Sequence, residues 1–584
     1  MLFIIATTVK CQKEQSFDAP ETIVTTPKNP ITANLQGIVL DENGAPTTGA
    51  LVIVGTKTAT TGANGFFRIL NASLDKSASM VKIEKAGYFV GYRTFMATAG
   101  SNHVKVKLVK KQLIATVNAA SGGAATLANG AKITLQANGV VKKAGGAFTG
   151  DVQVYAAYID PTAADIAETL PGSFMADDKD NKRVTLKSFG MLAVELESAT
   201  GEKLQVASGK TAELTTPIPT TLLATSPSTI PLWYVDEQTG LWKEQGSATK
   251  VGNNYVGNVS HFSFWNYDIS FPAVTLQFKV VTTSGLPLIN TSINLDANSF
   301  GSIGGHTDGN GAAIGFVPAN QNLILRINNG CDLSVFTLNI GSLSQNTNLG
   351  NIVIINPTQP IIEVFGNVVN CSGQPVSNGE VLITYNNSNT YYTYYHNTYT
   401  NVNSNGNFAY AFLKCNPNPT TIGVLGIDNT TQQQGIINSF TLNNTNFNVG
   451  TIIACGNSSS QFINYTLDGT NYSITNLVDS SRASTSNSAT SFYSSLNFMD
   501  IISSKNIRLG FTGNSQIPGS YAITDMNVQN HYLNPLSGST INITNFPLNI
   551  AEFFEGNFTA SYYDYPTPTI VHNINGNFRI RRAQ

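Results

Sequence analysis

Short runs of alternating apolar and polar residues, bounded by Gly, Asn or Pro, occupy most of this chain of 584 residues. The run 104–108 (Val-Lys-Val-Lys-Leu) is one example. Successive side chains of a strand point to opposite faces, so such a run buries one face of a sheet and exposes the other. Helical spacing is nearly absent, and the main helical candidate is the Ala-rich stretch 161–170. We therefore predict an all-β chain of tandem antiparallel β-sandwich domains.

Charged residues make up only 12% of the chain, against about 25% in typical soluble domains. Residues 1–270 carry 24 basic and 22 acidic side chains, whereas residues 271–584 carry 9 and 13. Asn, Ser and Thr replace the charges, and these short polar side chains suit strands and turns. We expect a domain boundary near Ser270. The formal net charge of -2 argues against a nucleic-acid binder, and no apolar run approaches the roughly 18 residues of a membrane-spanning helix.

The amino terminus has a short apolar run that ends at Cys11 and is followed by a polar stretch. This arrangement resembles a bacterial lipoprotein signal, which implies lipidation of Cys11 and a membrane anchor made of acyl chains. Two features depart from that pattern: no basic segment precedes the apolar run, and Lys10 stands where a small residue is preferred. An ordinary terminus is the alternative. We expect residues 1–30 to be signal, anchor and linker of an extracytoplasmic lipoprotein at the outer membrane or cell surface.

Four further cysteines are disulfide candidates. They allow three pairings, between which the sequence does not choose, and their spacing is too wide for zinc knuckles. Disulfides that staple adjacent domains would fit an oxidising compartment, and buried free thiols are the alternative. We expect neither a metal nor a cofactor. The four candidates are Cys331, Cys371, Cys415 and Cys455.

An internal repeat organises three segments of the chain. Each copy has a strand, a Gly-x-Pro turn, a second strand and later an Asn-Gly pair, which we expect to form a tight hairpin. The Gly-x-Pro turns are Gly44–Pro46, Gly285–Pro287 and Gly373–Pro375, and the pairs are Asn64-Gly65, Asn310-Gly311 and Asn405-Gly406.

This order of turns resembles the carboxypeptidase regulatory-like family, over residues 31–111, 272–355 and 361–455. The first copy also has that family's Gly-Tyr corner in Lys85-Ala86-Gly87-Tyr88, which the later copies lack. The resemblance implies transthyretin-like β-sandwiches that serve as non-catalytic building blocks of surface proteins. We accordingly assign domains to residues 31–111, 269–357 and 358–456.

Two further domains complete the chain. Residues 112–268 contain all three Trp residues (Trp233, Trp242 and Trp265) and resemble the Ig-like β-sandwich of ankyrins and netrin receptors. Residues 457–584 contain two Gly-Asn-Phe pieces that resemble the closing strands of small lipoprotein β domains from Bacteroidota. We expect about five β-sandwich domains in a row.

No motif with catalytic spacing is found, and we predict that the chain is not an enzyme. None of the six His residues lies in a His-Glu-x-x-His run, and we expect His261 to be packed or on the surface. Ser73–Lys76 lacks the companion motifs of a Ser-x-x-Lys nucleophile. Gly209–Thr211 lacks the earlier Gly of a phosphate loop. Asp177–Asp180 and Asp308 are better explained as a solvated loop and an Asx turn than as Ca²⁺ ligands.

The segment 385–399 is rich in tyrosine interleaved with Thr and Asn. An aromatic body with a polar tip suits recognition of glycans or proteins, and the alternative is a strand pair whose tyrosines cover a sandwich. The candidate ligand-binding residues are Tyr391, Tyr392, Tyr394 and Tyr395.

The whole pattern favours a non-catalytic cell-surface protein that presents tandem β-sandwiches for binding or adhesion. The alternative is a glycan-binding accessory protein of polysaccharide uptake. The expected partners are the membrane, through the lipid anchor, and a glycan or a surface protein, but no nucleic acid.

Overall fold

A computed structural model describes most of the chain as strands and turns. Cys11, Cys331, Cys415, Tyr391 and Tyr392 lie outside the described residues. The described residues are 28–62, 64–297, 301–329, 333–388, 393–414, 420–442, 445–458, 461–474, 482–487, 491–499, 506–528, 531–547, 552–563 and 570–582.

Residues 31–111, which we call module 1, form a sandwich of two sheets. One sheet has the strand order β4-β1-β7 and the other the order β3-β2-β5-β6. The first strand pairs antiparallel with β4 and parallel with β7, the last strand of the module. The strands are β1 (Pro30–Leu40), β2 (Leu51–Val54), β3 (Lys57–Thr60), β4 (Phe66–Asp75), β5 (Ser79–Glu84), β6 (Gly91–Phe95) and β7 (Asn102–Lys107).

The same plan recurs in module 3 (269–357) and module 4 (358–456). The three-stranded sheets are β23-β20-β26 and β30-β27-β34, each with a parallel pairing of first and last strands. The opposing sheets are β22-β21-β24-β25 and β29-β28-β31, where β33 also pairs with β31. The strands of module 3 are β20 (Phe264–Val281), β21 (Ser292–Ala297), β22 (Gly301–His306), β23 (Ala312–Pro318), β24 (Asn322–Asn328), β25 (Ser334–Ser342) and β26 (Thr347–Val353). Those of module 4 are β27 (Ile361–Val369), β28 (Gly379–Ser388), β29 (Thr393–Asn401), β30 (Asn407–Leu413), β31 (Thr420–Asp428), β32 (Gln433–Gln434), β33 (Asn438–Leu442) and β34 (Asn446–Ile453). The short strand β35 (Asn457–Ser458) lies just beyond the boundary at 456 but pairs with β32, so the sheet of module 4 extends into the first residues of the next segment.

The Gly-x-Pro turns have the same geometry in all three modules. Gly44, Gly285 and Gly373 have φ angles of 81°, 88° and 73°, which favour glycine. Each Pro that follows forms a bridge to the last residue of the first strand, as Pro46 does to Leu40. The repeated sequence signal is therefore a repeated turn that closes the same edge of three sandwiches.

The Asn-Gly pairs do not form the hairpins that we predicted. The turn at Asn64-Gly65 joins β3 to β4, which belong to different sheets of the sandwich. A Cβ atom at Gly65 would lie 2.3 Å from the carbonyl oxygen of Val39. Glycine therefore lets the turn pack against the first strand, and the chain crosses to the other sheet. Asn310-Gly311 and Asn405-Gly406 make the same crossing, from β22 to β23 and from β29 to β30.

Module 2 (112–268) is built around the three tryptophans, each fully buried. Its last strand, β20, continues without interruption into module 3, so the boundary near Ser270 lies within one strand. The fall in the density of charged residues near Ser270 coincides with the change from module 2 to module 3, and no linker separates the two modules there. Module 2 contains β8 (Leu113–Asn118), β9 (Gly123–Thr126), β10 (Lys132–Leu135), β11 (Val140–Lys142), β12 (Asp151–Ile159), β13 (Met175–Asp177), β14 (Arg183–Ser198), β15 (Lys203–Val206), β16 (Ala212–Pro217), β17 (Thr229–Val235), β18 (Trp242–Val251), β19 (Asn254–Val259) and a 3-10 helix at Thr220–Thr225.

The helical stretch predicted over 161–170 is mostly turns. Only α1 (Ile166–Thr169) is helical, and its residue Ile166 is buried in the core that modules 1 to 4 share. Four residues form about one helical turn, which is too short to be stable without tertiary packing. The described part of the chain contains no helix that is long and apolar enough to cross a membrane.

The C-terminal domain (457–584) is a single curled antiparallel sheet with the order β37-β36-β45-β44-β43-β41-β40-β39-β38. The two Gly-Asn-Phe pieces lie side by side, with Asn557 opposite Asn577. Its strands are β36 (Phe462–Leu467), β37 (Thr470–Ile474), β38 (Arg482–Asn487), β39 (Phe492–Met499), β40 (Asn506–Gly513), β41 (Gly519–Val528), β42 (His531–Leu533), β43 (Thr540–Asn545), β44 (Phe553–Tyr563) and β45 (Val571–Arg581).

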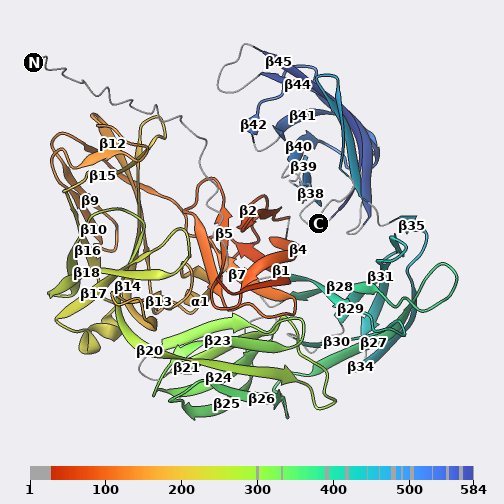
Figure 1. The fold of residues 1–584 in the computed structure, drawn as a ribbon, viewed down its shortest axis with the longest axis horizontal. Helices are drawn as coiled ribbons and strands as arrows, with labels where there is room; N and C mark the ends of the chain where they lie inside the picture. The colour runs from red at the N-terminus through yellow and green to blue at the C-terminus, as the bar shows by residue number, and fades with distance from the viewer. Residues whose placement is uncertain are drawn as a thin grey trace, which may run out of the picture.

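The modules are not arranged in a row. Module 1 lies at the centre, with module 2, module 3 and module 4 around it and the C-terminal domain at the periphery (Figure 1). One hydrophobic cluster contains buried residues of all four modules, including Tyr92, Trp242, Leu325 and Leu413. Burial of apolar surface between modules therefore holds the first four together.

Candidate functional site

Three histidines, one from each repeated module, meet where modules 1, 3 and 4 join. His103 lies on β7, His306 on β22 and His396 on β29. The ring centroids of His103 and His306 are 4.7 Å apart. All three side chains line a cavity of about 310 Å³. We call this place the histidine junction.

The histidine junction keeps the imidazoles of His103 and His306 uncharged. Burial lowers the pKa of His103 well below 6.5, and the neighbouring His306, His396 and Lys105 lower it further. Burial, with Lys105 and Arg93 nearby, lowers the pKa of His306 to about 3. A neutral imidazole can both donate and accept a hydrogen bond. The junction therefore offers polar groups without added positive charge at neutral pH.

Glu168 of module 2 contacts both cations beside the histidine junction. Glu168 of α1 forms an ion pair of 2.7 Å with Lys105, and its backbone carbonyl accepts a hydrogen bond of 2.7 Å from the guanidinium of Arg93. Within the described ranges, no group of three or more His, Cys, Asp or Glu side chains is placed to hold a metal ion. The junction brings polar side chains of three modules together, and the spacing of its histidines in the sequence does not predict it.

The tyrosine-rich segment contributes to packing through its two ends. Tyr385 is buried, stacks on His396 with 4.6 Å between ring centroids, and shares a hydrogen bond of 3.1 Å with Tyr410. Tyr399 lies under the guanidinium of Arg68 from module 1, 3.8 Å from its centroid. Both tyrosines therefore contribute to the interior of module 4 or its contact with module 1.

The four candidate tyrosines lie between these ends. Tyr394 and Tyr395 lie on β29, opposite Asn387 and Asn386 of β28. A recognition role for Tyr391, Tyr392, Tyr394 and Tyr395 stays a prediction.

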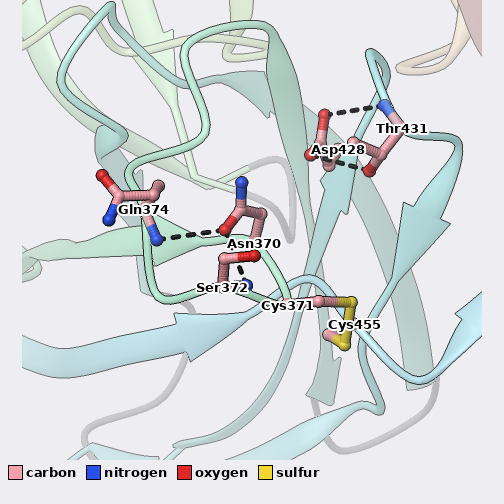
Figure 2. Close-up of a disulfide and its surroundings, with 7 residues drawn as sticks. All are labelled: Asn370, Cys371, Ser372, Gln374, Asp428, Thr431 and Cys455. Atoms are coloured by element: carbon pink, nitrogen blue, oxygen red, sulfur yellow. Dashed lines mark hydrogen bonds between the residues drawn. A yellow bond between two sulfur atoms is a disulfide. The ribbon is translucent and has the colours of Figure 1, made fainter.

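A disulfide joins Cys371 to Cys455, as Figure 2 shows. Cys371 lies two residues beyond Val369, and Cys455 two residues beyond Ile453, which is the partner of Val369 in the parallel pairing of β27 with β34. The two cysteines therefore extend adjacent strands by the same distance. For this pair, the expectation of a staple between adjacent domains is wrong, because the bridge closes one module on itself.

The turn that contains Cys371 is held by its own asparagine. The side-chain oxygen of Asn370 accepts hydrogen bonds of 2.9 and 3.0 Å from the backbone amides of Ser372 and Gln374 (Figure 2). In module 1, a side-chain oxygen of Asp41 likewise accepts hydrogen bonds from the backbone amides of Asn43 and Ala45. The disulfide is thus attached to a turn that is already fixed by local hydrogen bonds.

The acidic Ca²⁺ candidates are occupied by protein groups. Asp177 pairs with Arg183 at 2.7 Å and with Lys243 at 2.5 Å. Asp308 accepts hydrogen bonds from two backbone amides of its own turn, as an Asx turn requires, and from the hydroxyl of Thr98 at 2.5 Å. The last bond joins module 3 to module 1, a role that the sequence pattern does not reveal.

The remaining motifs have no catalytic setting. Ser73 lies on β4, a strand in place of the helix that a Ser-x-x-Lys nucleophile needs. Gly209 has a φ of 76° in the turn between β15 and β16, so Lys210 and Thr211 do not begin a helix. The ring of His261 contacts Tyr234 and Trp265 at 4.7 and 5.0 Å between centroids, which places it among packed aromatic side chains.

Comparisons with known proteins give distant structural likenesses. No protein-family model matches the chain, and no curated protein matches it. A streptococcal ancillary pilin is 10% identical, covers 41% of this chain and 95% of its own, and has a TM-score of 0.14. The shaft pilin SpaA from Lactobacillus rhamnosus GG is 11% identical, with 32% and 98% covered and a TM-score of 0.16. The Bacillus anthracis TIE protein is 9% identical, with 71% and 76% covered and a TM-score of 0.15. The assignment of tandem all-β domains rests on this chain's own strand pairings.

Proposed function

We propose that this chain is a non-catalytic protein of the cell surface that presents a rigid assembly of β-sandwich modules for binding or adhesion. The observation that carries the proposal is the set of polar contacts between module 1 and its neighbours. Lys107 pairs with Asp165 of module 2 at 2.6 Å, and Thr98 donates to Asp308 of module 3 at 2.5 Å. Arg68 pairs with Glu380 of module 4 at 2.7 Å. Such contacts suit a scaffold that holds a surface in place.

The shared topology of modules 1, 3 and 4 supports the resemblance to the carboxypeptidase regulatory-like family. Three copies have the same strand order, the same Gly-x-Pro turn and the same parallel pairing of first and last strands. We propose that all three are members of that family, including the two that lack the Gly-Tyr corner. In the first copy this corner has Gly87 at a φ of 84°, and the Tyr88 hydroxyl donates to Glu42 at 2.7 Å.

The disulfide supports export, because disulfides persist in oxidising compartments. We propose that Cys11 is lipidated and that the chain is an outer-membrane or cell-surface lipoprotein. Metabolic labelling with a palmitate analogue tests the anchor: the natural chain should incorporate it and the Cys11→Ala variant should not. Labelling of the variant, or none of the natural chain, would refute lipidation at Cys11.

Surface presentation is tested on intact cells. Protease added outside should remove the chain while leaving a periplasmic marker untouched, and cells that lack the gene should adhere less to their natural surface. Complementation with the natural gene should restore adhesion. If the chain resists the protease on intact cells but is cleaved after lysis, surface presentation is wrong.

The second candidate is a glycan-binding accessory protein of polysaccharide uptake. An uncharged face of the C-terminal domain favours it. The tyrosine segment is a separate candidate for the same activity. Substitution of Tyr392 and Tyr395 by Ala, followed by a glycan screen, tests the segment, and unchanged binding would exclude it.

A further inference from the structure

Ten uncharged hydrogen-bonding side chains form two rows across the outer face of the C-terminal sheet. The rows cross β37, β36, β45, β44 and β43, and each neighbouring pair of residues is directly opposed in the strand pairing. The first row is Ser473, Asn464, Asn577, Asn557 and Asn542, and the second is Asn471, Thr466, Asn575, Thr559 and Thr540. We call these ten residues the amide face.

The amide face lies on the surface of the C-terminal domain and is not part of its hydrophobic core. Alternate residues of the same strands, such as Ile574 and Phe578, point to the other side and are buried. Eight of the ten amide-face residues are exposed, and Asn464 and Thr466 are half-buried. Most of them line an open hollow of about 730 Å³. In Figure 1 the β44–β45 side of the domain lies at the outer edge of the molecule.

Charges appear only at the two ends of the amide face, and they are paired. Asp468 contacts His572 at 2.5 Å at one end, and Glu555 contacts Arg579 at 2.7 Å at the other. A soluble domain usually has about a quarter to a third of its surface charged. Ten adjacent positions without one charge therefore favour a neutral partner over an ionic one.

Hydrogen bonds within the rows fix part of the amide face before a ligand binds. The hydroxyl of Thr466 donates to the side-chain oxygen of Asn471 at 2.7 Å, and the hydroxyl of Ser473 donates to that of Asn464 at 2.6 Å. The amide nitrogen of each asparagine keeps its donor hydrogens. Such ordering lowers the entropy cost of binding.

We propose that the amide face binds a neutral polysaccharide in extended form. Strands lie about 4.8 Å apart, so a row of five spans roughly 19 Å, and this strand spacing is close to the advance of an extended glycan by one sugar ring. Each asparagine offers a donor and an acceptor to neighbouring hydroxyls of a sugar. The face lacks the aromatic and apolar anchors of a protein interface and the basic groups that nucleic acid requires.

This inference rests on the second candidate function, and its test uses the purified chain from residue 28 onward, which contains every described residue. The probes are soluble neutral polysaccharides (dextran, mannan, xylan and laminarin) and one acidic polysaccharide (alginate), each cast into native gels. We expect at least one neutral polysaccharide to retard the chain, and we expect added salt to leave the retardation unchanged because no charges are involved.

The decisive variant is Asn557→Ala with Asn577→Ala, at the centre of the first row. The dissociation constant should rise about tenfold through loss of two sets of hydrogen bonds. The matched control is Asn351→Ala with Asn401→Ala, two exposed strand asparagines of modules 3 and 4, which should bind like the natural chain. Both variants should retain the natural urea unfolding midpoint, because the substituted side chains are exposed.

Three results would overturn the inference: no neutral polysaccharide binds, binding is equally strong in the Asn557/Asn577 variant, or that variant alters only self-association in sedimentation. In any of these cases, loss of adhesion by cells lacking the gene would still support the surface function. Failure of the amide face is therefore distinguishable from failure of the broader proposal.

Discussion

Arg68 on β4 of module 1 and Glu380 on β28 of module 4 form an ion pair of 2.7 Å whose side chains are only 5% and 16% exposed. They are separated by 312 residues in the chain. The guanidinium of Arg68 also covers the ring of Tyr399. A buried charge is costly unless it is paired, so this contact fixes how module 4 sits on module 1.

Replacing Arg68 with Ala should therefore destabilise the assembly by about 2–3 kcal/mol, because it leaves the carboxylate of the half-buried Glu380 without its cation. Urea unfolding measures the loss. The control is Lys82→Ala, which removes an ion pair to Glu84 with 34% and 40% exposure and should cost less than about 1 kcal/mol. Equal effects of the two substitutions would contradict the structural role of the buried pair.

The histidine junction should make the assembly sensitive to acid. His103 and His306 have pKa values in the folded chain below their ordinary value of 6.5, that of His306 being about 3. Folding therefore favours the neutral form of each of these two imidazoles. This contribution to the stability of the fold is present above pH 6.5 and is lost as the pH falls towards the pKa of the folded chain. Each histidine contributes up to about 1.4 kcal/mol per pH unit.

Urea unfolding at pH 7.5, 6.0 and 5.0 measures this loss, and the double variant His103→Gln with His306→Gln should show a flatter dependence. The groups that face these rings are Lys105, Arg93, His396 and Glu168. Protonation would add positive charge beside two existing cations and one carboxylate. An unchanged slope in the double variant would show that the histidines do not control the response.

Asp268 on β20 should oppose folding at neutral pH. Its side chain is fully buried and accepts a hydrogen bond of 2.6 Å from Asn266, and burial raises its pKa well above 3.8. The folded chain therefore takes up a proton, and stability falls as the pH rises above 3.8 towards the folded pKa. Asp268→Asn should be more stable than the natural chain at pH 7, with the difference shrinking at pH 4. Equal urea midpoints at pH 7 would contradict the raised pKa.

The Cys371–Cys455 disulfide should stabilise module 4 by restricting its unfolded chain. Its sequence separation of 84 corresponds to about 4.5 kcal/mol in the loop-entropy description. Substitution of both cysteines by Ser should lower the unfolding free energy by up to that amount, and reduction of the natural chain should have a similar effect. A double variant as stable as the oxidised natural chain would argue against this role.

Local patterns predicted the all-β class and the repeated turn. Alternation of side chains identified the strands, and Gly44, Gly285 and Gly373 marked turns whose positive φ glycine adopts without strain. The same signals gave a wrong connection at Asn64-Gly65, because a tight turn has the same composition whether it joins strands of one sheet or of two. The site residues were less predictable, since neither the histidine junction nor the amide face has a local motif.

The sequence by itself determined which residues are strands, which turns repeat, and that the second half of the chain has few charges. Those properties depend on side-chain alternation, glycine conformation and composition, all of which act over a few neighbouring residues. Only the tertiary structure brought His103 to His306, Arg68 to Glu380, and Asn557 to Asn577. Those contacts depend on how whole sheets pack and pair, which long-range burial decides and local sequence does not record.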